Sequence, residues 1–315
     1  MALRSVDLRG LWVPVVTPLS QDGDVDVTAL DRLARRLLAD GSAGLVALGT
    51  TGEPATLRSD ERRRVIETCA HACADASKPL IVGAGSNCTR STIEDALRTE
   101  ALVQPAALLV VVPYYTRPSE PAIVEHFAAI ATSVSTPLVV YNIPHRTGRG
   151  LGVEAMLGLA ESPQIVGMKQ SVGSFDHDTL EILRRRPDGF EVLAGDDAYI
   201  APTVLMGGSG AIAAAAHVCT PTFAAMIEAA LAGDVSRTVA LANSLLPVID
   251  AGSLEPNPAG WKAALHATGE IASPALRMPM TAASPQSTTA LLAAIAACRG
   301  QLAQSPRMAS ARSGP

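Results

Sequence analysis

Residues 165–169 read Ile-Val-Gly-Met-Lys, and residues 170–173 continue with Gln-Ser-Val-Gly. A short apolar run rich in β-branched residues and closed by a polar, Gly-containing segment is typical of a buried strand that gives way to a loop. Lys169 then stands at the carboxyl end of that strand. Apolar surroundings favour the neutral form of a lysine amine, which can attack a carbonyl carbon to form a Schiff base. On these residues alone, a surface lysine with its stem on apolar neighbours is the more frequent arrangement.

The rest of the chain repeats this pattern. Short apolar runs alternate with amphipathic helical stretches, which predicts a parallel sheet, and eight such units predict closure into a barrel. An open doubly wound sheet is the alternative, but no G-x-G-x-x-G turn follows the first strand. The predicted strands are residues 11–16, 44–48, 80–83, 107–112, 138–141, 165–169, 190–194 and 210–213, and the helices between them are residues 27–40, 59–74, 89–103, 119–133, 153–161, 175–186 and 197–206.

After about residue 219 the pattern becomes wholly helical, over residues 221–232, 235–249, 258–268 and 287–298. The first of these completes the barrel. The prediction is therefore an α/β protein with a (β/α)8 TIM barrel as catalytic domain (residues 1–232) and a C-terminal helical domain (residues 233–300). Residues 301–315 lack apolar periodicity and are expected to be a disordered tail.

Composition excludes several classes of protein. The chain has 315 residues, a net charge of -5 and scattered Lys and Arg, so no basic stripe for nucleic acid is expected. The longest apolar run is too short to cross a membrane and the start lacks an apolar signal segment, so a cytoplasmic location is expected. A hydrophobic fraction of 48% suggests that other subunits cover part of the surface.

The five cysteines form no C-x-x-C pair. Cys69 and Cys73 lie one helical turn apart, but His71 between them would point to another face. Reduced core thiols are expected there, and no metal site.

The active site of such a barrel lies at the carboxyl ends of the strands. Residues 49–53 (Gly-Thr-Thr-Gly-Glu) follow the second strand, and a turn of this kind can hold a carboxylate. Three of the four tyrosines lie at the carboxyl ends of the fourth and fifth strands, which favours proton transfer by phenols. Arg146 offers a planar fork for a carboxylate, or pairs at the surface. Of the two carboxylates after the seventh strand, Asp197 is expected to cap a helix.

Together these motifs resemble a known family. GTTGE (49–53), PYY (113–115), YNIPHRTG (141–148), GMK (167–169), AGDD (194–197), GGSGAI (207–212) and EPNPAGWK (255–262) are similar to those of the dihydrodipicolinate synthase and N-acetylneuraminate lyase family of class I, Schiff-base aldolases. The resemblance covers about residues 8–298. It implies a barrel with C-terminal helices, pyruvate as the imine-forming substrate, an aldehyde as second substrate, no cofactor or metal, and a homotetramer built as a dimer of dimers.

The resemblance also assigns roles to residues. It makes Lys169 the Schiff-base lysine and Tyr141 the proton donor and acceptor. A proton relay would run through Thr50 and through Tyr115 of a neighbouring subunit. The substrate contacts would be made by Thr51, Arg146, Ile212 and Gly195.

Arg146 and the double threonine indicate the synthase branch, which condenses pyruvate with L-aspartate 4-semialdehyde on the way to diaminopimelate and lysine. One departure stands out, because most synthases have Glu-Ala after the lysine and this chain has Gln170 and Ser171. The change is expected to remove a charge beside the site. A related aldolase or dehydratase that acts on a sugar acid or another aldehyde, and a non-catalytic sensor, stay open as alternatives. Retention of both Lys169 and Tyr141 speaks against the sensor.

Feedback-inhibited members of the family bind lysine at a dimer interface. Asn87 and Tyr114 match two of the residues used there, but Arg62 and Ser91 stand where a histidine or a carboxylate would be expected. Weak or absent inhibition by L-lysine is therefore predicted.

Overall fold

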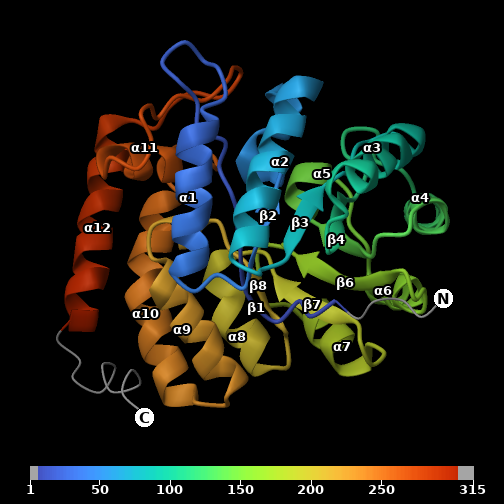
Figure 1. The fold of residues 1–315 in the computed structure, drawn as a ribbon. Coiled ribbons are helices and arrows are strands. Elements are labelled where there is room, and N and C mark those ends of the chain that lie inside the picture. The colour runs from blue at the N-terminus through green and yellow to red at the C-terminus, as the bar shows by residue number, and fades with distance from the viewer. Residues whose placement is uncertain (1–5, 304–315) are drawn as a thin grey trace.

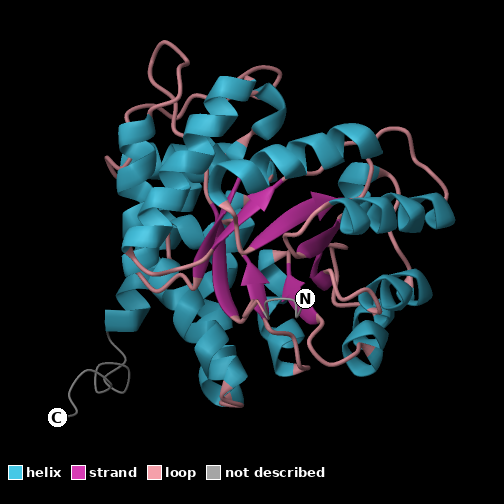
Figure 2. Cartoon of the chain, turned by 45° about the vertical axis from the view of Figure 1, so that its right-hand side comes forward, coloured by secondary structure: helices cyan, strands magenta, loops and turns pink. Residues whose placement is uncertain are grey.

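The computed structural model describes the backbone of residues 6–303 and the side chains of residues 6–300. Eight parallel strands close into a barrel in sequence order, and helices surround it, as Figures 1 and 2 show. The predicted (β/α)8 fold is thus confirmed. The strands are β1 (Gly10–Pro14), β2 (Gly44–Ala47), β3 (Leu80–Gly83), β4 (Ala107–Val111), β5 (Leu138–Asn142), β6 (Ile165–Gln170), β7 (Glu191–Ala194) and β8 (Gly210–Ile212).

The helices of the barrel follow the predicted stretches closely, apart from short turns that were not predicted. The segment expected as one helix at residues 197–206 divides into a 3-10 turn and a shorter α-helix, α8. The principal helices are α1 (Val27–Ala39), α2 (Ser59–Asp75), α3 (Thr89–Val103), α4 (Glu120–Ser133), α6 (Val153–Ala160), α7 (His177–Arg185), α8 (Ile200–Leu205) and α9 (Thr220–Leu231). The short turns are η1 (Thr50–Gly52), η2 (Pro54–Thr56), α5 (Pro144–Thr147), η3 (Asp197–Tyr199) and η4 (Ala215–His217).

The inside of the barrel is filled by side chains. Trp12 is fully buried and its indole N–H donates to the Leu8 carbonyl at 2.9 Å. A Cβ atom at Gly44 would lie 2.4 Å from the Trp12 ring, so the large side chain requires glycine on the neighbouring strand. The barrel is consequently a packed core rather than a channel. The residues of this interior cluster are Leu8, Trp12, Val46, Ile81, Ala107, Leu109, Val139, Tyr141, Ile143, Leu193 and Ile212.

Three further helices follow the barrel: α10 (Val235–Gly252), α11 (Ala259–Ala267) and α12 (Pro285–Ala303). Helix α10 packs against α9 and α12, and Figure 1 shows them side by side. The predicted division into two domains at residue 232 remains a prediction. Helix α12 continues to Ala303, three residues into the segment expected as a tail, and residues 304–315 lie outside the described part.

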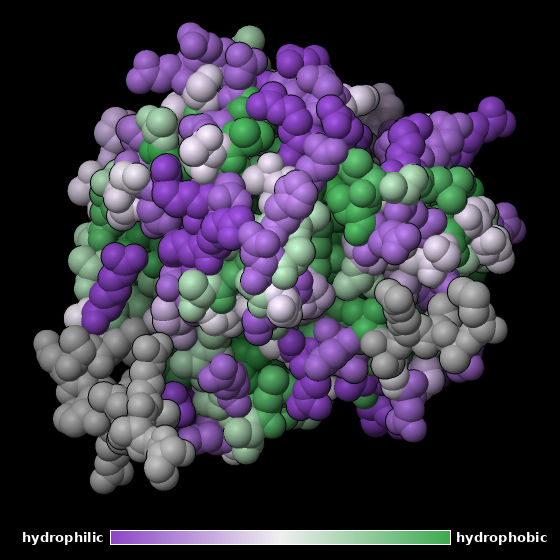
Figure 3. Space-filling view, in the orientation of Figure 1, coloured by the Kyte–Doolittle hydropathy of each residue, from purple (hydrophilic) through white to green (hydrophobic). Residues whose placement is uncertain are grey.

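Polar and apolar residues intermingle on the face shown in Figure 3. Within residues 6–303, no helix combines the length and the hydropathy that a membrane crossing needs. Cys69 and Cys73 are buried with free thiols, and burial raises the pKa of Cys73 to about 12, as expected for core thiols.

Candidate active site

An irregularity in strand β6 turns Lys169 into the barrel. Leu138 of β5 pairs with Ile165, but the next residue, Val139, pairs with Gly167, so Val166 is an extra residue in β6. Because successive side chains of a strand point to opposite faces, one inserted residue exchanges the faces of all that follow. In a strand with regular alternation, residues 165, 167 and 169 would share one face, so Lys169 would face the helices as Ile165 does. With the extra residue, Lys169 lies opposite the inward-facing Tyr141.

Lys169 and Tyr141 contact each other at the carboxyl ends of their strands. The Lys169 Nζ atom lies 4.4 Å from the centre of the Tyr141 ring, and the two residues are 7% and 6% exposed. Both line a cavity of about 630 Å³ at this end of the barrel. Thr51, Arg146 and Gly195 line the same cavity, so the structure brings five of the eight predicted site residues together.

Gly195 provides the space for the lysine. A Cβ atom at this position would lie 2.8 Å from Lys169 Cε and 1.9 Å from Ser171 Oγ. The side chains of Lys169 and Ser171 therefore lie side by side over Gly195, and any larger residue would displace them. This close approach explains why glycine is required here.

Asp197 lies in the cavity wall and does not act as the expected helix cap. The residue that precedes η3 is Asp196, whose carboxylate accepts from the Gly173 N–H instead. Asp197 is the first residue of η3, and its Oδ2 atom accepts from the Ala215 N–H at 3.0 Å. Burial raises the pKa of the Asp197 carboxyl to about 6, while the nearby Lys169 acts in the opposite direction.

Buried polar atoms without a hydrogen-bond partner concentrate at this cavity. Five such side-chain atoms occur among the described residues, and three of them, Ser171 Oγ, Asp197 Oδ1 and Asn257 Oδ1, belong to residues of the cavity wall. An unpartnered buried polar atom is costly unless a ligand or water completes it. The cavity wall thus offers hydrogen-bonding positions for a polar ligand.

Gln170 corrects an expectation drawn from the sequence. Its side chain faces away from the cavity, where its amide donates to Thr179 and accepts from Asn142, at 3.1 Å and 2.9 Å. Gln170 does not line the cavity. A charge at position 170 would therefore not lie in the cavity, because the side chain of residue 170 points to the other face of β6, toward α7.

Three predicted residues lie outside the cavity wall. Thr50 is exposed and directly precedes Thr51 in η1. Ile212 is fully buried in the interior cluster together with Tyr141. Tyr115 is 87% exposed, in a loop where its φ angle is +69°. Within the described chain, no hydrogen bond joins Tyr115 or Thr50 to Tyr141.

Helix α11 and the segment between α10 and α11 supply a wall of the cavity that was not predicted. Asn257, Trp261 and Leu254 line it, although they lie more than 80 residues after Lys169. A Cβ at Gly252 would lie 1.9 Å from the Trp261 ring, so α10 and α11 are packed tightly beside the site. The motif at residues 255–262 was the only sequence feature that pointed to this segment, and its residue types did not indicate that it lines the cavity.

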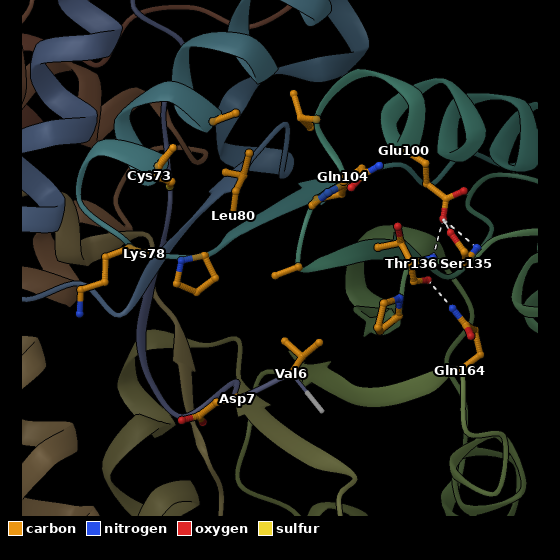
Figure 4. A pocket seen from close by; sticks show the side chains of 17 residues that line it. Val6, Asp7, Cys73, Lys78, Leu80, Glu100, Gln104, Ser135, Thr136 and Gln164 are labelled. Atoms are coloured by element: carbon orange, nitrogen blue, oxygen red, sulfur yellow. Dashed lines mark hydrogen bonds between the residues drawn. The ribbon is translucent and has the colours of Figure 1, made fainter. Parts of the chain in front are cut away.

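A larger cavity of about 1160 Å³ lies at the opposite end of the barrel, where strands β3 to β5 begin (Figure 4). Four of its polar residues bond to one another, since Glu100 accepts from the backbone N–H groups of Ser135 and Thr136, and Gln164 donates to the Thr136 carbonyl. None of the predicted site residues lies there. Because barrel enzymes use the carboxyl ends of their strands, the smaller cavity is the candidate active site.

The fold and this site define a barrel protein that presents an amine and a phenol in one cavity, an arrangement suited to carbonyl chemistry. A family model described as the dihydrodipicolinate synthetase family matches residues 7–298. The chain belongs to this family, which confirms the resemblance found in its motifs.

Individual relatives agree with the family match. The chain is 38% identical over 297 residues to a 4-hydroxy-tetrahydrodipicolinate synthase of Neisseria meningitidis serogroup B. The aligned region covers 94% of this chain and 100% of that protein. The dihydrodipicolinate synthase from Acinetobacter baumannii, complexed with pyruvate, has a TM-score of 0.89 and 32% identity over 93% of this chain and 99% of that one. The enzyme from Cyanidioschyzon merolae, with lysine bound, has a TM-score of 0.87 and 32% identity, covering 92% and 98%.

Proposed function

We propose that the protein condenses pyruvate with L-aspartate 4-semialdehyde, the reaction of a 4-hydroxy-tetrahydrodipicolinate synthase and a step toward diaminopimelate and lysine. The observation that carries this proposal is the inward-facing Lys169 in contact with Tyr141 at the bottom of the cavity. Among the residues that line that cavity, Lys169 is the only lysine. The family and the named synthases support the same reaction.

Lys169 would begin the reaction as a nucleophile. Its amine attacks the keto carbon of pyruvate, water leaves, and an imine joins the substrate to the chain. Loss of a proton from the methyl group gives an enamine, whose terminal carbon attacks the aldehyde carbon while the aldehyde oxygen takes up a proton. Attack of water or of the semialdehyde's own amine on the imine carbon then breaks the bond to Lys169 and frees its amine. The imine accepts the electrons of the broken C–H bond, so this route needs no cofactor. Tyr141 would donate and accept protons in these steps.

Two groups are suited to hold the carboxylates of the two substrates. The Thr51 hydroxyl accepts a hydrogen bond from the Asn257 amide at 3.1 Å, which leaves its own hydrogen free to donate to the pyruvate carboxylate. Arg146 lies at the mouth of the cavity on the short helix α5. No ion pair in the described part of the chain includes Arg146, so its guanidinium is available for the second substrate's carboxylate.

The proton relay is proposed to require a second subunit. Tyr115 is 87% exposed and its neighbour Tyr114 is 39% exposed, which supports coverage of this surface by another copy. In a homotetramer built as a dimer of dimers, Tyr115 of a neighbouring subunit would complete the relay from Tyr141 through Thr50. A cytoplasmic location is proposed with this biosynthetic role.

The proposal is tested by a coupled assay that offers pyruvate together with L-aspartate 4-semialdehyde, beside a panel of hydroxylated and aromatic aldehydes. The semialdehyde should give the highest kcat/KM of the panel. Failure to consume pyruvate with the semialdehyde, under conditions where another aldehyde is accepted, would overturn the proposed second substrate.

One observation favours a second candidate, condensation with a hydroxylated aldehyde. Ser171 Oγ and Asp197 Oδ1 are unpartnered in the cavity wall and could complete their hydrogen bonds with sugar hydroxyls. The same panel separates the candidates, because a hydroxylated aldehyde would then be the preferred substrate.

A further inference from the structure

The C-terminal helical part of the chain contacts the turn at residues 49–53 in three places. The Asn257 side chain donates to Thr51 Oγ1 at 3.1 Å. Lys262 Nζ donates to Glu53 Oε1 at 2.8 Å, and the Arg277 backbone N–H donates to Glu53 Oε2 at 3.1 Å. Both carboxylate oxygens of Glu53 are thus held by residues that lie 209 and 224 positions later in the chain.

Glu53 needs this support because its backbone is unusual. It has a φ of 57° and a ψ of 39°, a left-handed conformation that residues other than glycine rarely adopt. Such a residue persists only where its surroundings fix it. The Glu53 side chain is 5% exposed, so the contacts from Lys262 and Arg277 are made inside the protein.

The Lys262–Glu53 ion pair is better explained by the position that it gives to Glu53 than by a contribution to the stability of the fold. The Lys262 side chain has no exposed surface, and burial lowers its pKa although the Glu53 carboxylate acts in the opposite direction. Replacing a buried ion pair by apolar groups of similar size is often neutral or stabilising. What the pair adds is a fixed position for Glu53, two residues from Thr51.

Arg277 anchors the same segment to the barrel. Its guanidinium pairs with the buried Glu61 of α2 and donates to the carbonyls of Gly23 and Thr56. The segment that holds Glu53 is consequently also bonded to the chain that follows the turn, at Thr56 and Glu61, and to the loop that contains Gly23.

We propose that Lys262 is a positioning residue for the substrate carboxylate: through Glu53 it holds the turn at residues 49–53, and with it Thr51, in the shape that binds pyruvate. This inference rests on the proposed function, in which that turn binds pyruvate. Lys262 itself does not line the cavity. The C-terminal helices then determine the affinity for the keto acid, although they do not carry the nucleophile.

The test is the double variant Glu53→Gln/Lys262→Met, which removes both charges and leaves neither partner buried alone. The readout is covalent trapping at Lys169 with borohydride, followed by mass spectrometry over a range of pyruvate concentrations. The pyruvate concentration for half-maximal trapping should rise roughly tenfold, a change of about 1.4 kcal/mol. Trapping at saturating pyruvate and the thermal unfolding midpoint should stay close to those of the natural chain.

The single variant Lys262→Met should lose stability, because Glu53 is left buried without its partner, and the second substitution should restore stability without restoring pyruvate affinity. A matched control is Glu154→Gln/Arg185→Met, which neutralises an exposed ion pair between α6 and α7 and should change neither quantity. If the first double variant does not fold, Glu53→Gln alone removes the charge that Lys262 holds and keeps a polar side chain of similar size at residue 53, and it should also raise the half-maximal concentration.

The outcomes separate two failures. No trapping in the natural chain would overturn the proposed function. Trapping in the natural chain with an unchanged half-maximal concentration in the folded variant would overturn the positioning role and leave the pair a purely structural contact.

Discussion

The Lys169 amine lies 4.4 Å from the centre of the Tyr141 ring, and the two residues are direct cross-strand partners on β6 and β5. The proposed nucleophile and the proposed proton-carrying phenol are therefore fixed relative to each other by the sheet itself, rather than by a mobile loop. The proposed chemistry can be tested at each of these groups separately.

Pyruvate and borohydride should add an irreversible mass at Lys169 and abolish activity. Lys169→Arg should not be labelled, because a guanidinium is almost always protonated and cannot form the imine. Peptide mass spectrometry identifies the modified residue. Lys262 and Lys78 serve as internal controls, since the first is buried behind the turn and the second lies at the other end of the barrel. A label on either would contradict the assignment.

Tyr141→Phe should lower kcat by roughly two to four orders of magnitude, the usual contribution of a positioned acid-base group. The substitution removes only the hydroxyl and keeps the ring beside Lys169. Slow imine formation with pyruvate should therefore persist. Steady-state kinetics combined with borohydride trapping measures both, and a kcat within threefold of the natural value would remove Tyr141 from the mechanism.

Arg146→Ala should chiefly raise the KM for L-aspartate 4-semialdehyde. It removes a hydrogen bond to a charged group, worth about 1.5 to 3 kcal/mol, so an increase of about 10- to 150-fold is expected. The KM for pyruvate should change little. Arg149→Ala is the matched control, because Arg149 is exposed nearby and does not line the cavity. An unchanged KM for the semialdehyde would favour the hydroxylated aldehydes instead.

Asp197→Asn should stabilise the protein at neutral and alkaline pH. Because burial raises the pKa of the folded-state carboxyl from 3.8 to about 6, the charged form is disfavoured on folding, and stability is lost as the pH rises from about 4 through 6. The amide removes this cost, which is on the order of 2 to 3 kcal/mol. Urea unfolding should show a gain for the variant at pH 8 and little difference at pH 4. The exposed Asp22→Asn is the control, and equal gains at both pH values would count against the burial of a charge.

L-Lysine should inhibit weakly or not at all. The Asp95 carboxylate already pairs with Arg62 at 3.6 Å, so an added cation would have to compete with the positive charge of that arginine. An incoming ammonium would meet it at a cost of about 1 kcal/mol in a partly wet interface. Titration of lysine at sub-saturating pyruvate measures the effect. Half-inhibition below about 1 mM, which corresponds to roughly -4 kcal/mol of binding, would show that a lysine site exists in another form.

The barrel was predictable because each strand leaves its own local signal in the sequence. All eight apolar runs became strands, and the residues at their carboxyl ends gave Lys169, Tyr141 and Arg146 as site residues. What local patterns could not show was the inward direction of Lys169, which depends on the extra residue Val166 and hence on the pairing with β5. The position of Gln170 behind the strand has the same origin.

Contacts between segments far apart in the sequence could not be predicted either. Glu53 and Lys262 form an ion pair across 209 positions, and neither residue type indicates the other as its partner. The predicted helix cap at Asp197 is wrong for a related reason. An acidic residue before a helix usually caps it, whereas here the carboxylate accepts a hydrogen bond from the backbone N–H of Ala215, after β8.

The filled interior of the barrel limits how substrates and products can enter and leave the cavity. Trp12 and its neighbours separate the two cavities at opposite ends, so nothing can pass along the barrel axis from one to the other. Every molecule that reaches Lys169 must enter and leave through the same opening, which Arg146 and the C-terminal helices border. In the proposed reaction, the water released by imine formation, the arriving aldehyde and the departing product would therefore share one route, and occupancy of that route by any of them would delay the others.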